Sequence, residues 1–378
     1  MKKQGRKVVV LCSAMVVVIA SMIAPAWSYK LAVESSEEER RLAKIAPRPW
    51  WSVSWVDSLL SKASISVFAE PVHEEITNRM FGCNGDAEVC AGSGALDAPA
   101  AVLAGVRWND DPPFRLLRSE AKGTNCVASE TIRFETQPGC WAALFHSANK
   151  RAAKGAEFGV GDAMLYRTHF GDLQFLHAMA SRDGEPASIT RENILGWLEF
   201  SWRASLGEYT LETRLNSIEN PVIQRAFGTS GWRIQDLYTL GAGGGLRRQI
   251  SDVAFGSFLH TIQDSFAEGH LDREESTGVM SCSSGAVAAK APGSIRSFHA
   301  YNRQDHSAHA DADTRGAFMK RYKEKGNVVQ FGAVLVDARD RRMSWEEVRP
   351  MLECAFSIID PKAPAGPGDF APLRNAGV

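Results

Sequence analysis

The sequence of 378 residues predicts an all-α fold of many helices joined by disulfide-bearing loops. Apolar residues recur at spacings of three and four in residues 162–181 and 190–206, as they do in amphipathic helices. Residues 247–268 are apolar almost all round, which indicates a buried central helix. No alternation of apolar and polar residues predicts a sheet, and no internal repeat occurs.

The composition is that of a globular protein. Hydrophobic residues make up 44% of the chain and charged residues 23%, so a large core can form and full disorder is excluded. The 43 basic and 44 acidic residues give a formal net charge of −1. Because there is no basic excess, duplex nucleic acid is not an expected partner.

The first 26 residues are typical of a secretory signal. Four basic residues precede an uncharged apolar run over 8–24, and Ala24-Pro25-Ala26 has the small-x-small form that signal peptidases cleave. An uncleaved membrane anchor is the alternative, although the run is short for a span. Cleavage predicts a secreted or periplasmic protein with 39 basic and 44 acidic residues, a formal net charge of −5. Residues 27–69 would then be an N-terminal arm or a propeptide.

Six cysteines remain after this cleavage, and an even number in an exported protein indicates disulfide bonds. Six cysteines allow fifteen connectivities. The short-loop pairs Cys83–Cys90 and Cys126–Cys140 are reasonable, and they would leave Cys282 to pair with Cys354. A zinc site made of cysteines is not favoured, because the sequence contains no C-x2-C pair.

Local patterns predict the remaining elements. We expect one helix to begin after Pro71, and Thr190 to cap the helix over 190–206, with Glu192 in its first turn. The expected helices cover 71–81, 162–181, 190–206, 247–268 and 344–359. Stretches rich in Gly, Ser or Cys predict loops or breaks at 83–95, 120–142, 241–245 and 274–297. These elements form one domain over 70–360, and the Pro- and Gly-rich tail over 361–378 is expected to be mobile.

A histidine and a carboxylate share one face of the central helix. His260 and Asp264 are four residues apart, and His270 follows Gly269, where the helix can end. A buried helix does not carry such groups without partners, and a divalent metal ion would satisfy both. An isolated pair of this kind is more often only hydrogen-bonded, so further donors are needed to support a metal site.

A second cluster supplies those donors. In residues 305–313, His309 and Asp313 repeat the spacing of four residues, with Asp305, His306 and Asp311 close by. Alone, such a run is usually a solvated face, and its carboxylates could instead favour calcium. Together with the first cluster, it predicts the second half of a site for several metal ions.

The two clusters resemble a known family. H-x3-D-x5-H followed by D-x3-H-x3-D is similar to the core pattern of bacterial zinc-dependent phospholipase C, which shares its fold with the zinc-dependent single-strand nucleases. The resemblance implies an all-α enzyme with two to three zinc ions in a cleft, and further ligands upstream. Those ligands are identified as His73, as Asp110 rather than Asp111, and as His169 in a His-Phe-x-Asp segment. His177, about 80° round a helix from His169, and His146 are the alternatives.

The resemblance also implies how the ions divide the ligands. The first zinc would have Asp110, His169, His260 and Asp264. The second would have His270, His309 and Asp313. The third would have His73 and Asp264, completed in the family by an N-terminal Trp. Cleavage after Ala26 would free Trp27, which lies 46 residues before His73, whereas Trp50, Trp51 or Trp55 would need a second cut.

The expected activity is hydrolysis of a phosphodiester, with Asp110 orienting or deprotonating the attacking water. As a phospholipase C, the protein would act on phospholipid at a membrane or micelle surface, converting phosphatidylcholine to diacylglycerol and phosphocholine. No protein partner is implied. A single-strand nuclease or 3'-nucleotidase is the first alternative; the charge of −5 argues against it. The second is a non-catalytic secreted binding protein whose metal site is incomplete.

Overall fold

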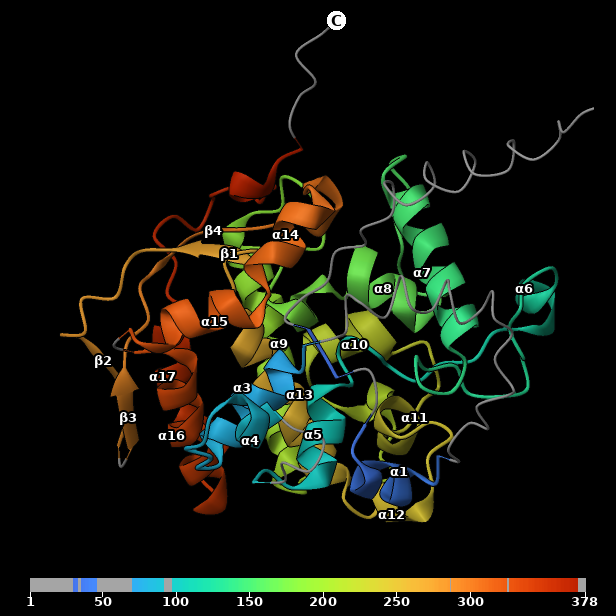
Figure 1. Ribbon diagram of the computed structural model, residues 1–378, viewed down its shortest axis with the longest axis horizontal. Helices are drawn as coiled ribbons and strands as arrows, with labels where there is room; N and C mark the ends of the chain where they lie inside the picture. The colour runs from blue at the N-terminus through green and yellow to red at the C-terminus, as the bar shows by residue number, and fades with distance from the viewer. Residues whose placement is uncertain are drawn as a thin grey trace, which may run out of the picture.

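The computed structural model describes residues 30–32, 35–45, 70–91, 97–285, 287–324 and 326–372. About half of this part of the chain is helical (Figure 1). The α-helices are α1 (Glu37–Ala43), α3 (Val72–Met80), α4 (Ala87–Ala91), α5 (Ala100–Val106), α6 (Arg118–Ala121), α7 (Pro138–Ala152), α8 (Met164–Phe170), α9 (Ala187–Ser205), α10 (Pro221–Phe227), α11 (Ile234–Tyr238), α12 (Gly244–Arg247), α13 (Ile250–Asp264), α14 (His306–Ala312), α15 (Arg315–Tyr322), α16 (Val328–Asp340) and α17 (Trp345–Ala355). Short 3-10 helices are η2 (Gln174–His177), η3 (Leu215–Ser217), η4 (Tyr301–Arg303) and η5 (Gly368–Phe370).

Two small antiparallel sheets correct the prediction of an all-α fold. β1 (Leu271–Arg273) pairs with β4 (Ile295–Phe298), and β2 (Ser281–Ser284) pairs with β3 (Val287–Lys290). β2, β3 and most of β4 lie where a loop over 274–297 was expected, and β1 comes directly before it. The strands have only three or four residues, so any alternation in burial is too short a pattern to be detected in the sequence.

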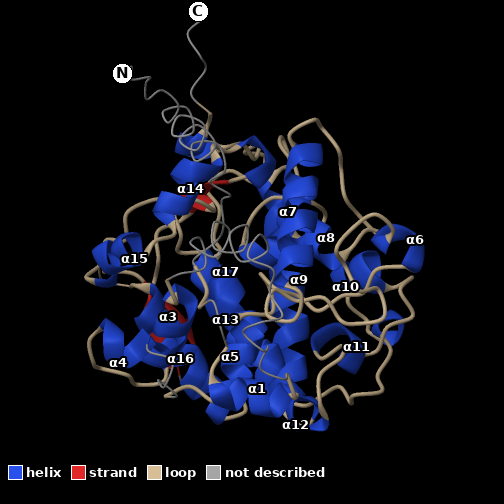
Figure 2. Ribbon diagram, turned by 45° about the vertical axis from the view of Figure 1, so that its right-hand side comes forward, coloured by secondary structure: helices blue, strands red, loops and turns tan. Residues whose placement is uncertain are grey.

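α13 is the central element of the core. Figure 2 shows it in the middle of the molecule with α3, α5 and α9 around it. Two glycines let α5 and α13 approach closely: a Cβ on Gly105 would lie 2.0 Å from the Val253 carbonyl oxygen, and one on Gly256 would lie 2.0 Å from that of Val102. This contact brings the turn after α5 against the C-terminal half of α13, where the predicted metal ligands lie.

Other predicted helices are confirmed with small changes. α3 matches the helix expected over 71–81, and α17 begins with a capping box in which Ser344 and Glu347 bond each other's backbone N–H. α9 begins at Ala187 after Pro186, so Thr190 is not its N-cap. Thr190 instead donates a hydrogen bond to Glu185 from inside the helix.

The continuous helix predicted over 162–181 is wrong. α8 ends at Phe170, Gly171 is extended, and the chain resumes helical turns only in η2. Apolar spacing continues through the break because both pieces face the same core. His169 and His177 therefore lie on two separate helical segments, and the angle of about 80° between them, which assumed one continuous helix, does not apply.

Covalent and terminal contacts complete the domain. The structure pairs Cys83 with Cys90, Cys126 with Cys140 and Cys282 with Cys354, as expected. The tail expected to be mobile contacts the domain as far as Phe370, since the Ala365 carbonyl accepts a hydrogen bond from Gly184 N and the Gly366 carbonyl accepts one from Ala300 N. In the described part of the chain, every helix is too short or too polar to cross a lipid bilayer.

Candidate metal centre

His260 and Asp264 are the two candidate ligands that α13 contributes to the site. Both are fully buried on one face of α13, with His260 Nε2 2.9 Å from Asp264 Oδ2. His260 Nδ1 donates a hydrogen bond to the Val106 carbonyl at the end of α5, at 2.7 Å. The Nε2 lone pair therefore points toward the carboxylate side and can bind an ion.

Asp110 lies in the turn after α5, and its side chain points toward His260. Its neighbour Asn109 is locked in place, because Asn109 Nδ2 donates to the Leu176 carbonyl and Ser257 donates to Asn109 Oδ1. Asp110 Oδ2 then lies 4.0 Å from His260 Nε2. Asp111 turns the other way and accepts a hydrogen bond from Phe134 N, so the structure favours Asp110 over Asp111 as the ligand.

The break after α8 brings His177 into the first donor group. His177 Nδ1 lies 2.9 Å from Asp264 Oδ2, 3.1 Å from His260 Nε2 and 3.6 Å from Asp110 Oδ1. Bonds of about 2.0–2.1 Å in a tetrahedron would place ligand atoms roughly 3.4 Å apart. The spacing of these four residues is close to that value, and Asp110, His177 and His260 lie together as donors for one ion.

His169, the first choice from the sequence, lies at the edge of this group. Its Nε2 is 4.0 Å from Asp110 Oδ1, and none of the donor groups found in the described residues includes it. The geometry favours His177 as the ligand. His146 is exposed on α7 and lies outside these groups.

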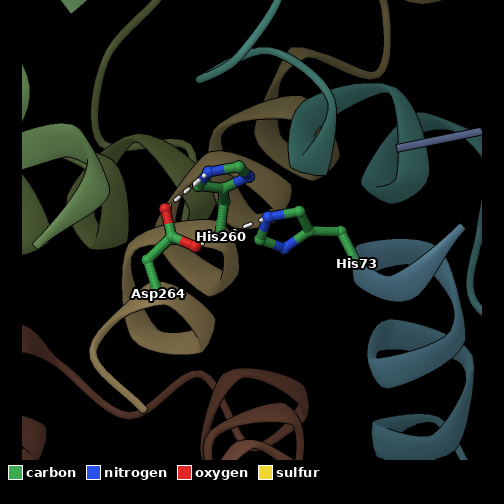
Figure 3. Close-up of side chains that lie close together, drawn as sticks. All are labelled: His73, His260 and Asp264. Carbon is green, nitrogen blue, oxygen red and sulfur yellow. Dashed lines mark ion pairs between the residues drawn. The ribbon is translucent and has the colours of Figure 1, made fainter. Parts of the chain in front are cut away.

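His73 forms the third group by reaching across from α3 (Figure 3). Its Nε2 lies 3.5 Å from Asp264 Oδ1 and 3.9 Å from Asp110 Oδ2. Asp264 can therefore serve two ions, with Oδ2 toward the first group and Oδ1 toward the third. This is the bridging role implied for it by the sequence resemblance.

Gln263 orients His73, and the sequence analysis missed it. Gln263 Nε2 donates to Thr77 Oγ1 at 2.7 Å, so the amide oxygen faces His73 and accepts a hydrogen bond from its Nδ1 at 2.5 Å. The Nε2 of His73 is left as the ligand atom. A polar side chain between Ile262 and Asp264 on a buried helix was the available signal.

The second group contains His270, His309 and Asp313. His309 Nε2 lies 2.9 Å and His270 Nε2 4.0 Å from Asp313 Oδ2. A Cβ on Gly269 would lie 2.7 Å from His309 Nδ1, so the glycine before His270 allows this close approach. Asp311 is exposed and lies outside the group, and nothing is described of the His306 side chain.

Several of the buried donor atoms have no hydrogen-bond partner. Within the described part of the chain, four of the proposed ligand atoms are buried and make no hydrogen bond: Asp264 Oδ1, His270 Nε2 and both carboxylate oxygens of Asp313. Such a cluster is costly unless an ion satisfies it. The number of convergent, unsatisfied donors therefore fits bound metal.

The same burial shifts the pKa values of the donors. It lowers the pKa of His73 and of His309 to about 3 and that of His270 to about 4. It raises the pKa of Asp313 to about 7 and that of Asp264 well above its usual range, the latter with help from Asp110 and Asp313. The histidines are therefore held neutral, which is the form that binds metal.

The N-terminal segment lies directly beside His73. The Lys30 carbonyl accepts hydrogen bonds from Val72 N at 2.8 Å and from His73 N at 3.4 Å. Trp27, whose amine would complete the third group, lies outside the described residues.

A small cavity opens above the donors. It has a volume of about 20 Å³, enough for one or two water-sized groups. The residues that line it are Asp110, Thr168, His169, Gln174, His177, Met179, His270, Tyr301 and His309. It joins the first and second groups, so a small ligand bound there would contact both.

Comparison of this chain with protein-family models, with curated proteins and with solved structures gave no match. The case for the site therefore rests on its own geometry and on the chemistry of its donors.

Proposed function

We propose that this protein is a zinc-dependent phosphodiester hydrolase. One observation carries the proposal: three groups of buried donors adjoin one another beside a cavity that can hold a water, and Asp264 lies against two of them. Each group contains at least one imidazole nitrogen, which suits zinc better than calcium, since calcium prefers oxygen ligands. Adjacent divalent ions are suited to displacement at phosphorus.

The residues of the chain would divide the work as follows. Asp110, His177, His260 and Asp264 would hold the first ion, His270, His309 and Asp313 the second, and His73 with Asp264 the third. Zinc bound there would neutralise the phosphate oxygens and lower the pKa of a nearby water. Asp110, which lines the cavity, would orient the attacking water and accept its proton.

Phospholipid is the substrate we propose first. The resemblance of the two His–Asp clusters to bacterial phospholipase C supports it. Phosphatidylcholine would yield diacylglycerol and phosphocholine.

A single-strand nuclease is the second candidate. The His-Phe-x-Asp segment is part of the resemblance to phospholipase C and favours that interpretation, yet its His169 lies outside the donor groups while His177 lies inside. That reason is therefore weaker. A nuclease would bind the same metal ions and differ in what covers the cavity.

Metal content and product analysis on one sample test these proposals. We would determine zinc per chain by elemental mass spectrometry, sequence the N-terminus, and offer phosphatidylcholine micelles and single-stranded DNA in parallel. Two to three zinc ions with release of diacylglycerol would support phospholipase C, and nucleotide release instead would support the nuclease. An N-terminal Trp27 would support export and a role for its amine at the third ion.

The opposite results are equally clear. Protein purified without chelator that holds no zinc would refute the hydrolase. Folded, zinc-free protein would instead favour the non-catalytic secreted binding protein. Zinc-loaded protein that cleaves neither substrate would leave the metal assignment intact and refute both substrate proposals.

A further inference from the structure

His169 is a cavity histidine that the three donor groups do not use. It lines the same cavity as His177, His270 and His309, which all belong to groups. The first group already has donors from four residues at suitable spacing without it. Its place beside Asp110 therefore calls for a role other than that of a resident ligand.

The His169 ring is held in one orientation. Its Nδ1 lies 3.1 Å from the Leu165 carbonyl oxygen, which can only accept, so Nδ1 carries the hydrogen and donates it. Thr168 Oγ1 lies 2.9 Å from the same nitrogen. The rings of Trp141 and Phe145 contact the imidazole at right angles and limit its rotation. Nε2 is thereby directed, as a hydrogen-bond acceptor, toward Asp110.

The separation of the two acceptors fits one water molecule. His169 Nε2 and Asp110 Oδ1 are 4.0 Å apart, too far for a direct hydrogen bond. A water about 2.8 Å from each would meet them at roughly a right angle, close to the angle between its own two O–H bonds. Both hydrogens would then point at the acceptors, and the lone pairs of the oxygen would point away from them.

We infer that His169 and Asp110 together hold the attacking water, with His169 as its second acceptor rather than as a metal ligand. This inference rests on the proposed phosphodiesterase function. In the step it describes, the water oxygen forms the new bond to phosphorus and the ester P–O bond breaks toward the alcohol. One water proton passes to Asp110 and then to the departing alkoxide, so that an alcohol and a phosphomonoester result. His169 keeps its hydrogen bond to the other hydrogen.

The test compares four variants on a substrate that is neither lipid nor nucleic acid, bis(p-nitrophenyl) phosphate. His169→Leu removes the acceptor, and His169→Gln restores an amide oxygen near the position of Nε2. His177→Gln changes a proposed ligand, and His146→Gln is the matched control at an exposed histidine. Zinc per chain, kcat, KM and melting temperature are measured for each zinc-loaded protein.

We expect His169→Leu to keep the wild-type zinc content and KM while kcat falls about 10²-fold, the usual effect of removing one well-placed hydrogen bond in catalysis. His169→Gln should recover about a tenth of the wild-type kcat or more. His177→Gln should lose zinc, and His146→Gln should match the wild type. If His169→Leu does not fold, the zinc content and kcat of His169→Gln decide between ligand and acceptor.

Loss of one zinc ion from either His169 variant would overturn the inference, because it would make His169 a ligand. An unchanged kcat in His169→Leu would overturn it as well. Both results leave the proposed function standing, since the wild type would still be a zinc-loaded hydrolase. A wild type without zinc or without hydrolysis would refute the proposed function and, with it, this role of His169.

Discussion

The first and second donor groups contain the same kinds of residue, but the protein holds them differently. In the first group, His260 is fixed by the Val106 carbonyl and Asp110 follows the hydrogen-bonded Asn109, all on the contact between α5 and α13. In the second group, His309 lies on the seven-residue α14, and its Nδ1 has no hydrogen-bond partner among the described residues. Ligands that are oriented before the ion binds usually bind it more tightly.

Contacts from other segments hold the second group in place. Arg315, two residues after Asp313, bonds the buried Glu75 on α3 at 2.7 Å. The ring of Phe370 in the C-terminal tail lies edge-on to His309, with an angle of 70° between the ring planes and ring centres 6.1 Å apart. The comparison teaches that the first group is built into the core, whereas the second depends on elements packed onto it. We therefore expect its ion to leave first.

The largest effect is expected at Asp264, because it adjoins two donor groups. Asp264→Asn should remove about two zinc ions and lower kcat by about 10³-fold or more, since several kcal/mol of charge stabilisation is lost. Asp311→Asn is the matched control at an exposed carboxylate of α14. Elemental mass spectrometry and bis(p-nitrophenyl) phosphate hydrolysis are the measurements. Loss of a single ion would contradict the bridging role.

The next largest effect is expected from lower pH, at which the second group should lose its zinc ion before the first group does. Burial raises the pKa of Asp313 to about 7, and only its ionised form binds zinc well. As pH falls through 7, protons therefore compete with zinc for Asp313, and they also compete for Asp264 of the first group, whose pKa is raised as well. The second ion should still leave first, because the ligands of the second group are less firmly oriented. Zinc retained after dialysis at pH 8, 7 and 6 measures this, with His309→Gln as the protein already lacking the site. Simultaneous release of all ions would argue against two differently held groups.

Gln263 should have a smaller and more local effect. Gln263→Leu removes the acceptor that fixes the His73 tautomer, so the affinity for the third ion should fall about 10- to 100-fold. Thr77→Val, which removes only the hydroxyl bonded to Gln263, should change the affinity less. Competition with a zinc-binding dye follows the release. An equal loss of zinc affinity at all three groups would indicate that the substitution destabilises the whole fold instead.

The smallest effect on zinc binding is expected from a substitution in the C-terminal tail. Phe370→Ala should weaken zinc binding at the second group by about tenfold or less, because it removes a packing contact and no ligand. Asp369→Ala, at the exposed neighbouring residue, is the control. The same dye competition should show the first group unchanged. An effect of Phe370→Ala on the first group would contradict the independence of the two regions.

Local patterns predicted the elements that are long and strongly periodic. The helix with His260 and Asp264 and the three disulfide pairs were expected from the sequence, and the structure has them. The short strands around Cys282 were missed because three or four residues carry too little alternation. The helix over 162–181 was predicted as continuous because apolar spacing does not register an extended residue such as Gly171.

The sequence by itself determined the donor types and their order along the chain, because spacings of four residues place two side chains on one face of a helix. It favoured Asp110 over Asp111 and His169 over His177, and the geometry agrees only with the first of these choices. Those choices depend on where α8 breaks and on how closely α5 approaches α13, and both follow from packing between residues far apart in the chain. The tertiary structure alone also placed Gln263 against His73 and Lys30 beside it, since hydrogen bonds across 190 and 43 positions leave no local pattern.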